Sequence, residues 1–170
     1  DDFDLEFLAK HTPGFSGADL ANVCNEAALT AARRDKSAIE KQDFLDAVDR
    51  IIGGLERKTK IITPDEKRSI AHHEAGHAVI GVKVRNATIV QKVTIIPRGQ
   101  AGGYALHMPA EEKFTQSKKE LLAAITSALG GRVAEEIMFD DVSTGAYGDF
   151  QQATRIARAM VTEYGMSNLG

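Results

Sequence analysis

Cysteine is almost absent from this sequence, which contains Cys24 and no other. A single thiol excludes an internal disulfide bond and fits a reducing compartment. Cys24 shares one side of a predicted helix with small and apolar residues, so we expect a buried structural thiol rather than a nucleophile. These neighbours are Leu20, Ala27, Ala28 and Ala31.

Long apolar runs and an excess of basic residues are also missing. No continuous apolar stretch reaches the ~18 residues of a membrane-spanning helix. The formal net charge is -3, whereas a nucleic-acid-binding protein would favour a basic face, so we do not expect nucleic acid as a partner. A length of 170 residues, 43% of them hydrophobic, is typical of a soluble globular protein with one moderate or two small domains. The chain starts without Met and stops just after a predicted helix, so we expect a soluble fragment.

One stretch, residues 70–81, carries recognisable chemistry. Its pattern His-Glu-x-x-His places His73 and His77 on the same face of a predicted helix, where two imidazoles can hold one Zn²⁺. Glu74 between them can act as general base for a zinc-activated water that attacks a peptide carbonyl. The alternative is an amphipathic helix with two solvated or core histidines. His72 points about 100° away and fits a supporting role better than that of a ligand.

A catalytic zinc normally has three protein ligands and one water, so a third ligand is needed. The nearby pattern that would supply another histidine fails, because Lys83 stands at its place. Two distant sources of a carboxylate remain. One is the pair Glu135 and Glu136 on a predicted helix, and the other is Asp149, on a glycine-containing loop that leads into a predicted helix. Either carboxylate could instead fix the tautomer of a histidine ligand, and the residues alone leave this open.

Apolar periodicity and capping residues predict a mainly helical chain with one small β element. Helices are expected over residues 4–11, 17–34, 41–50, 64–82, 118–137 and 150–164, after the capping residues Ser16, Thr63 and Ser117 in three cases. Residues 88–108 alternate as two strands around a glycine-rich loop. The free edge of this hairpin could pair with an extended polypeptide, or the strands could only close the core.

Two glycine features affect the expected organisation. Gly76 inside the zinc-motif helix costs about 1 kcal/mol relative to alanine, and close approach of another backbone would compensate for it. The glycine pair at 53–54, followed by a charged run, predicts a linker between two helical blocks.

The first block resembles a known domain. Residues 12–22 read Thr-Pro-Gly-Phe-Ser-Gly-Ala-Asp-Leu-Ala-Asn and are followed by Asn-Glu-Ala-Ala and Ala-Arg-Arg. Together they resemble the C-terminal helical lid of an AAA+ ATPase of the FtsH type. The resemblance implies that Gly17 and Ala18, at a helix start, lie near an adenine nucleotide, although simple capping is the alternative. No Gly-x-x-x-x-Gly-Lys-Ser/Thr loop is present, so ATP hydrolysis would belong to an upstream core.

The second block resembles the zinc peptidase domain of the same FtsH family. The resemblance rests on His-Glu-Ala-Gly-His (73–77), Gly-Tyr (103–104), Gly-Gly-Arg-Val-Ala-Glu-Glu (130–136) and Ser-Thr-Gly-Ala-x-x-Asp-x-x-x-Ala-Thr (143–154). It implies that Asp149 is the third zinc ligand and that Glu135 supports a histidine ligand without binding the metal itself. Tyr147 and Gly148 depart from the small polar residues that are frequent in the family.

The resemblance implies a lid over residues 1–52, a linker over 53–62 and a peptidase domain over 63–170 that is truncated at its C-terminus. It also implies an ATP-dependent, membrane-associated zinc endopeptidase that degrades unfolded and membrane proteins. The cofactors would be Zn²⁺ and, for the full-length protein, ATP with Mg²⁺. The full-length protein would form a homo-hexamer held by segments outside this chain at the cytoplasmic face of a bacterial inner membrane, or at its organellar equivalent. The alternative is an ATPase-associated domain that binds polypeptide without cleaving it.

Overall fold

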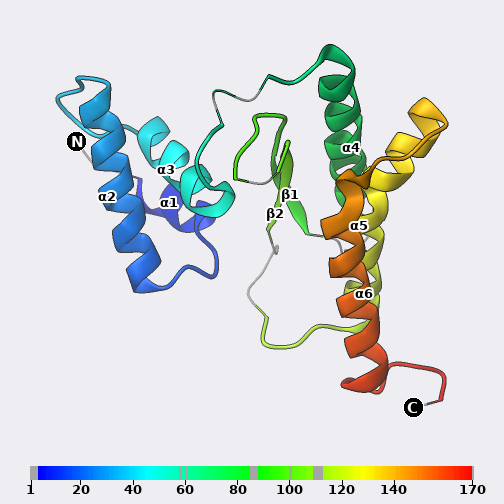
Figure 1. The fold of residues 1–170 in the computed structure, drawn as a ribbon. Coiled ribbons are helices and arrows are strands. Elements are labelled where there is room, and N and C mark those ends of the chain that lie inside the picture. Colours follow the sequence, from blue (N-terminus) through cyan, green and yellow to red (C-terminus); the bar gives the residue numbers. More distant parts are fainter. Residues whose placement is uncertain are drawn as a thin grey trace. The chain divides into compact units, whose positions relative to one another are not determined.

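A computed structural model describes residues 4–57, 59, 61–84, 88–99, 101–108 and 113–169. These residues form six α-helices, one 3₁₀ turn and a two-stranded antiparallel sheet (Figure 1). The mainly helical fold class with a small β element is therefore confirmed. The chain divides into two compact units, one of residues 1–58 with 97–101 and one of residues 59–96 with 102–170. No helix of the described residues is both long and apolar enough to cross a bilayer.

The first unit is built on three helices, α1 (Leu5–His11), α2 (Gly17–Arg33) and α3 (Lys41–Gly53). The predicted start of α2 is confirmed, because Ser16 and Asp19 form a reciprocal capping box. Helix α3 runs three residues beyond the expected end at Arg50. Ile51 explains this extension, since it packs against the apolar core and continues the helical face beyond Arg50. The core consists of Val23, Ala27, Phe44, Ala47 and Val48.

Cys24 is exposed, so the expectation of a buried structural thiol is wrong. The buried positions of α2 are Val23, Ala27 and Ala31, which recur every four residues. Cys24 follows this stripe by one position and therefore points about 100° away from it.

Asp43 holds the turn between α2 and α3 together. Its side chain is fully buried and accepts hydrogen bonds from Arg34 Nη1 at 2.9 Å, Lys36 Nζ at 3.0 Å and the backbone N–H of Glu40 at 3.0 Å. Burial acts to raise the pKa of Asp43, but the Glu40 N–H and the two cations outweigh it and hold this pKa below its usual value. The carboxylate thus stays ionised inside the unit.

The second unit carries the remaining elements: α4 (Pro64–Lys83), β1 (Ile89–Thr94), β2 (Tyr104–Met108), α5 (Lys118–Phe139), the 3₁₀ turn η1 (Thr144–Ala146) and α6 (Tyr147–Thr162). Helix α4 packs against α5 and against both strands, and α6 packs against α5. The predicted hairpin is confirmed, with Val93 opposite Ala105. The predicted starts of α4 and α5 are also confirmed, because Thr63 and Ser117 accept hydrogen bonds from the first turns.

Helix α6 begins at Tyr147, three residues earlier than expected. Asp149 therefore lies in the first turn of a helix, and the expectation that it sits on a loop is wrong. The preceding 3₁₀ turn explains the difference, since it leads directly into α6 and leaves no irregular segment between them.

Two glycines bring the backbones of α4 and α5 into contact. A Cβ atom on Gly130 would lie 2.8 Å from the carbonyl oxygen of Gly76, and a Cβ on Gly76 would overlap the Gly130 carbonyl. Neither position has room for a side chain. The close approach of another backbone, expected to compensate for Gly76, is confirmed.

Candidate metal centre

The interior face of α4 is polar. The buried residues of this 20-residue helix are His73, Glu74 and His77. Buried polar groups are costly unless they find partners, so each of these side chains needs a specific environment. The partners of the two histidines come from α5 and from the start of α6.

Both histidines are oriented through their Nδ1 atoms. His77 Nδ1 lies 2.8 Å from the carbonyl oxygen of Ser127 on α5. A carbonyl oxygen can only accept, so Nδ1 carries the proton and Nε2 keeps its lone pair. His73 Nδ1 lies 2.6 Å from Glu135 Oε1. Burial acts to raise the pKa of Glu135, but Ser143 and His73 outweigh it and hold this pKa below its usual value, so the carboxylate accepts and His73 takes the same tautomer.

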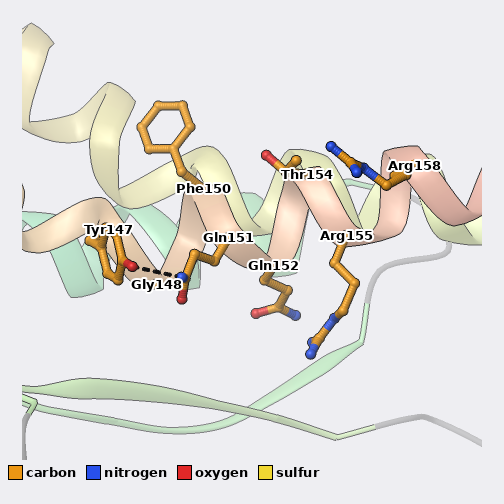
Figure 2. A pocket seen from close by; sticks show the side chains of 8 residues that line it. All are labelled: Tyr147, Gly148, Phe150, Gln151, Gln152, Thr154, Arg155 and Arg158. Carbon is orange, nitrogen blue, oxygen red and sulfur yellow. Dashed lines mark hydrogen bonds between the residues drawn. The ribbon is translucent and has the colours of Figure 1, made fainter.

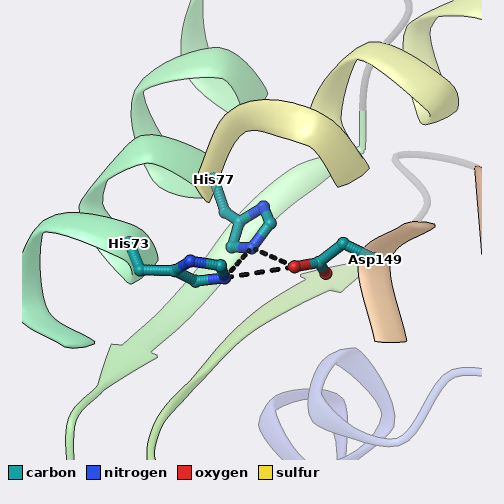
Figure 3. A group of neighbouring side chains, drawn as sticks. All are labelled: His73, His77 and Asp149. Atoms are coloured by element: carbon teal, nitrogen blue, oxygen red, sulfur yellow. Dashed lines mark hydrogen bonds and ion pairs between the residues drawn. The ribbon is translucent and has the colours of Figure 1, made fainter. Parts of the chain in front are cut away.

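The two free Nε2 atoms meet the carboxylate of Asp149, as Figure 3 shows. The two Nε2 atoms are 3.1 Å apart, and Asp149 Oδ2 is 3.1 Å from His73 Nε2 and 3.5 Å from His77 Nε2. Asp149 occupies the first turn of α6, where the helix dipole favours an anion. Burial opposes its ionisation, but the two histidines outweigh it and hold the pKa of Asp149 at about 2.

Three electron-pair donors thus converge on one point, with all three ligand atoms within 4.8 Å of one another. Lone pairs this close repel unless a cation lies between them. Asp149 favours a proton at this point: burial acts to lower the pKa of His73 and His77, but the carboxylate outweighs burial and raises the pKa of both above the usual value. Two imidazoles and one carboxylate are also a donor set that fits Zn²⁺ and leaves a position open.

Glu74 lies beside this donor set but makes no hydrogen bond with any described residue. Burial raises its pKa, although the two histidines act in the opposite direction. A Cβ atom on Gly103, just before β2, would lie 3.1 Å from Glu74 Cγ, so the backbone of the hairpin packs directly on this side chain. An unbonded carboxyl group with a raised pKa is suited to accept a proton near neutral pH.

The other residues singled out from the sequence lie elsewhere. His72 is hydrogen-bonded to the carbonyl of Arg68 and packs edge-on against Phe139, and Glu136 is exposed. Gly17 and Ala18 are exposed at the start of α2, and a Cβ on Gly17 would meet no atom within 4 Å. Their proximity to a nucleotide stays a prediction.

Two residues at the centre were not found from the sequence. Ser127 acts through its backbone carbonyl, which every residue type possesses, so no sequence signal marks it. Ser143 donates its backbone N–H to Glu135 Oε2 at 2.7 Å. Its signal was its place at the start of the Ser-Thr-Gly-Ala motif, directly before a helix.

An open groove with a volume of about 810 Å³ lies along α6 (Figure 2). Tyr147, Gln151 and Arg155 succeed one another along it, and Gln151 Nε2 donates to the Tyr147 hydroxyl at 2.8 Å. His73, His77 and Asp149 are not among the residues that line it. The groove is therefore separate from the metal centre.

The family model of peptidase family M41 matches residues 60–170, and that of the AAA+ lid domain matches residues 2–46. The ATP-dependent zinc metalloprotease FtsH of Acholeplasma laidlawii is 63% identical over 163 residues, which are 96% of this chain and 25% of that protein. The protein of the same name from Aster yellows witches'-broom phytoplasma is 63% identical over 170 residues, or 100% of this chain and 25% of that protein. The one from Bacillus subtilis is 56% identical over 163 residues, or 96% and 26%. The chain spans about a quarter of the length of these curated relatives.

Proposed function

The chain belongs to peptidase family M41, and from this premise we propose that its second unit is the catalytic domain of a zinc endopeptidase. His73, His77 and Asp149 would hold the metal through Nε2, Nε2 and a carboxylate oxygen. The convergence of these three atoms within 4.8 Å is the observation that carries the proposal. Zinc, when bound, would supply the Lewis acid that activates water toward a peptide carbonyl.

Glu74 would move the proton in this reaction. Its carboxylate would accept a proton from the attacking water and deliver it to the amide nitrogen of the leaving chain. Its raised pKa supports this role, because a base works best when its pKa approaches the working pH. Glu135 and the Ser127 carbonyl would keep both histidines in the tautomer that presents Nε2.

The substrate would be an extended polypeptide. The backbone of Gly103, just before β2, packs on Glu74, so a chain paired with the hairpin would lie close to the base. Main-chain pairing of this kind depends little on side-chain sequence and suits the degradation of unfolded proteins.

The wider context is also proposed and is supported by the relatives, which are named ATP-dependent zinc metalloproteases. The first unit, which matches an AAA+ lid domain, would couple the peptidase to an ATPase core that uses ATP and Mg²⁺. Gly17 and Ala18 would approach the nucleotide there. The complete protein would act on unfolded and membrane proteins as a membrane-anchored homo-hexamer, at the cytoplasmic face of a bacterial inner membrane or its organellar equivalent.

The test measures bound zinc and casein cleavage in the complete protein. Glu74→Gln should keep about one zinc per chain and lose cleavage by at least about 10²-fold, because it removes the base and no ligand. His77→Ala should lose both. Glu136→Gln is the matched control, since Glu136 is an exposed carboxylate on α5 that lies outside the donor set.

Two outcomes would contradict the proposal. Cleavage retained by Glu74→Gln would remove Glu74 from the mechanism. Zinc bound by the wild type without any cleavage would instead favour a domain that binds polypeptide and does not cut it.

A further inference from the structure

Glu135 uses both of its carboxylate oxygens. Oε1 accepts from His73 Nδ1 at 2.6 Å, and Oε2 accepts from the backbone N–H of Ser143 at 2.7 Å. The residue is only 3% exposed, so water does not compete for either contact. One buried group on α5 therefore holds two parts of the chain that are distant in sequence.

Ser143 begins the segment that carries Asp149. Its Oγ accepts from the backbone N–H of Gly145 at 3.1 Å and caps the 3₁₀ turn Thr144–Ala146. That turn runs directly into α6, whose third residue is Asp149. Ala146, between the two, is buried. A displacement of Ser143 would therefore be transmitted to Asp149 through a short, hydrogen-bonded stretch of backbone.

We infer that Ser143 is a positioning residue for Asp149, and that Glu135 joins the imidazole of His73 and the carboxylate of Asp149 into one preassembled pair. The inference rests on the proposed metal centre and extends it. Glu135 is thus more than a partner of one histidine, because its second oxygen fixes where the ligand from α6 arrives. Ser143 touches no metal ligand and acts through the turn that it caps and through its contacts with Glu135.

The chemistry of the carboxylate suggests a substitution that cannot keep both contacts of Glu135. Both partners of Glu135 donate, and a carboxylate has two oxygens to receive them. Glutamine has a single acceptor oxygen, and its amide N–H groups would face a donor on the other side. Glu135→Gln can therefore satisfy His73 or Ser143 but not both.

The test is a double-mutant cycle on zinc affinity, measured by competition with a chelator in the complete protein. Ser143→Ala should weaken zinc binding by about 10-fold, the lower end of the effect of groups that orient metal ligands. In an Asp149→Asn background the same substitution should have a clearly smaller effect, since the ligand that it positions through the turn has already been removed and only its side-chain contact with Glu135 is left to lose. Ser143→Thr, which keeps the hydroxyl, should restore the affinity.

Glu135→Gln should lose zinc affinity by two routes, one through Asp149 and one through His73. Part of its loss of affinity, the part through Asp149, should disappear in the Asp149→Asn background, and the part through His73 should remain. Equal losses in both backgrounds would show that Glu135 acts on His73 alone and would overturn the inference.

Ser117→Ala is the matched control. Ser117 caps α5 through a hydrogen bond of the same kind, from Glu120 N–H to Oγ, and has no link to a ligand. This substitution should lower thermal stability and leave zinc affinity unchanged. A Ser143→Ala protein with wild-type zinc affinity would refute the positioning role, whereas a wild-type protein that binds no zinc would refute the proposed metal centre instead.

Discussion

The imidazole of His73 rests against the backbone of Gly131. A Cβ atom at position 131 would lie 2.6 Å from both Cδ2 and Cε1 of this ring, so only glycine leaves the ring its place. Glu135, one turn further along α5, receives the Nδ1 proton of the same ring. Helix α5 thus provides both the space and the orientation for one histidine.

Gly131→Ala is expected to weaken zinc binding by at least about 10-fold, because the added methyl group would push the His73 ring away from Asp149. Chelator competition measures this effect. Gly148→Ala is the control, since a Cβ there meets no atom within 4 Å. Unchanged zinc affinity in Gly131→Ala would show that the His73 ring can shift and still bind the metal.

Gly76→Ala tests the contact between α4 and α5. Alanine favours a helix by about 1 kcal/mol over glycine, but the added methyl group would meet the Gly130 carbonyl and Ala134 Cβ. Overpacking typically costs about 1–3 kcal/mol, so we expect a net loss of stability. Chemical denaturation beside Gly148→Ala measures the difference. A stabilised Gly76→Ala protein would mean that the two helices separate at little cost.

Zinc affinity should depend on pH through the two histidines. Burial alone would lower their pKa, but Asp149 raises the pKa of both above the usual value, so protons compete for Nε2 at a higher pH than they would for a free imidazole. Affinity should be full above the raised pKa and should fall as pH decreases, by about tenfold per pH unit for each proton displaced.

Titrations of zinc between about pH 6 and 8 measure this dependence. Asp149→Asn should shift the onset of competition to lower pH, since it removes the charge that stabilises the imidazolium, while it also lowers the affinity itself. His72→Gln should retain the wild-type profile, because His72 lies outside the donor set. A flat profile in the wild type would argue against histidine ligation.

Asp43→Asn should destabilise the first unit. At neutral pH the loss should exceed that of Asp46→Asn, because an amide offers a single acceptor oxygen to Arg34, Lys36 and the Glu40 N–H, which the buried carboxylate of Asp43 accepts together. Asp46→Asn is the matched control, since Asp46 pairs with Arg34 in a more exposed position. Equal losses in the two variants would contradict the special role of Asp43.

The difference in stability between the wild type and Asp43→Asn should depend on pH. The pKa of Asp43 in the folded state is lowered, so its contribution is complete above the unfolded value of about 3.9 and is lost as pH falls through the folded value. The difference in stability between wild type and Asp43→Asn should therefore shrink below about pH 4. Urea denaturation from acid to neutral pH measures this difference.

Local rules were sufficient for most of the fold. Ser16, Thr63 and Ser117 marked helix starts correctly, because a cap depends on residues only three positions away. The buried stripe of α2 was misplaced by one position at Cys24, since alanine-rich helices offer apolar residues on several faces. The position of Asp149 in a helix was missed because a 3₁₀ turn precedes it.

The candidate site was predictable where side chains carry the chemistry. The spacing of His73 and His77 came from a sequence pattern and the choice of Asp149 from the family resemblance, and the structure brings these three residues together. The contacts that orient them were not predictable in the same way. The Ser127 carbonyl and the Ser143 N–H belong to the backbone, and only the tertiary packing brings the first to His77 and the second to Glu135.

The division of the donor set between α4 and α6 affects the order of events during folding. The segment Pro64–Lys83 holds two of the three donors, and the third arrives 72 residues after His77, once α5 and α6 have docked. A nascent or partly unfolded chain would therefore present only incomplete sites, which bind the ion weakly. Capture of the metal would come last, and a peptidase assembled in this order would stay inert until its own folding was finished.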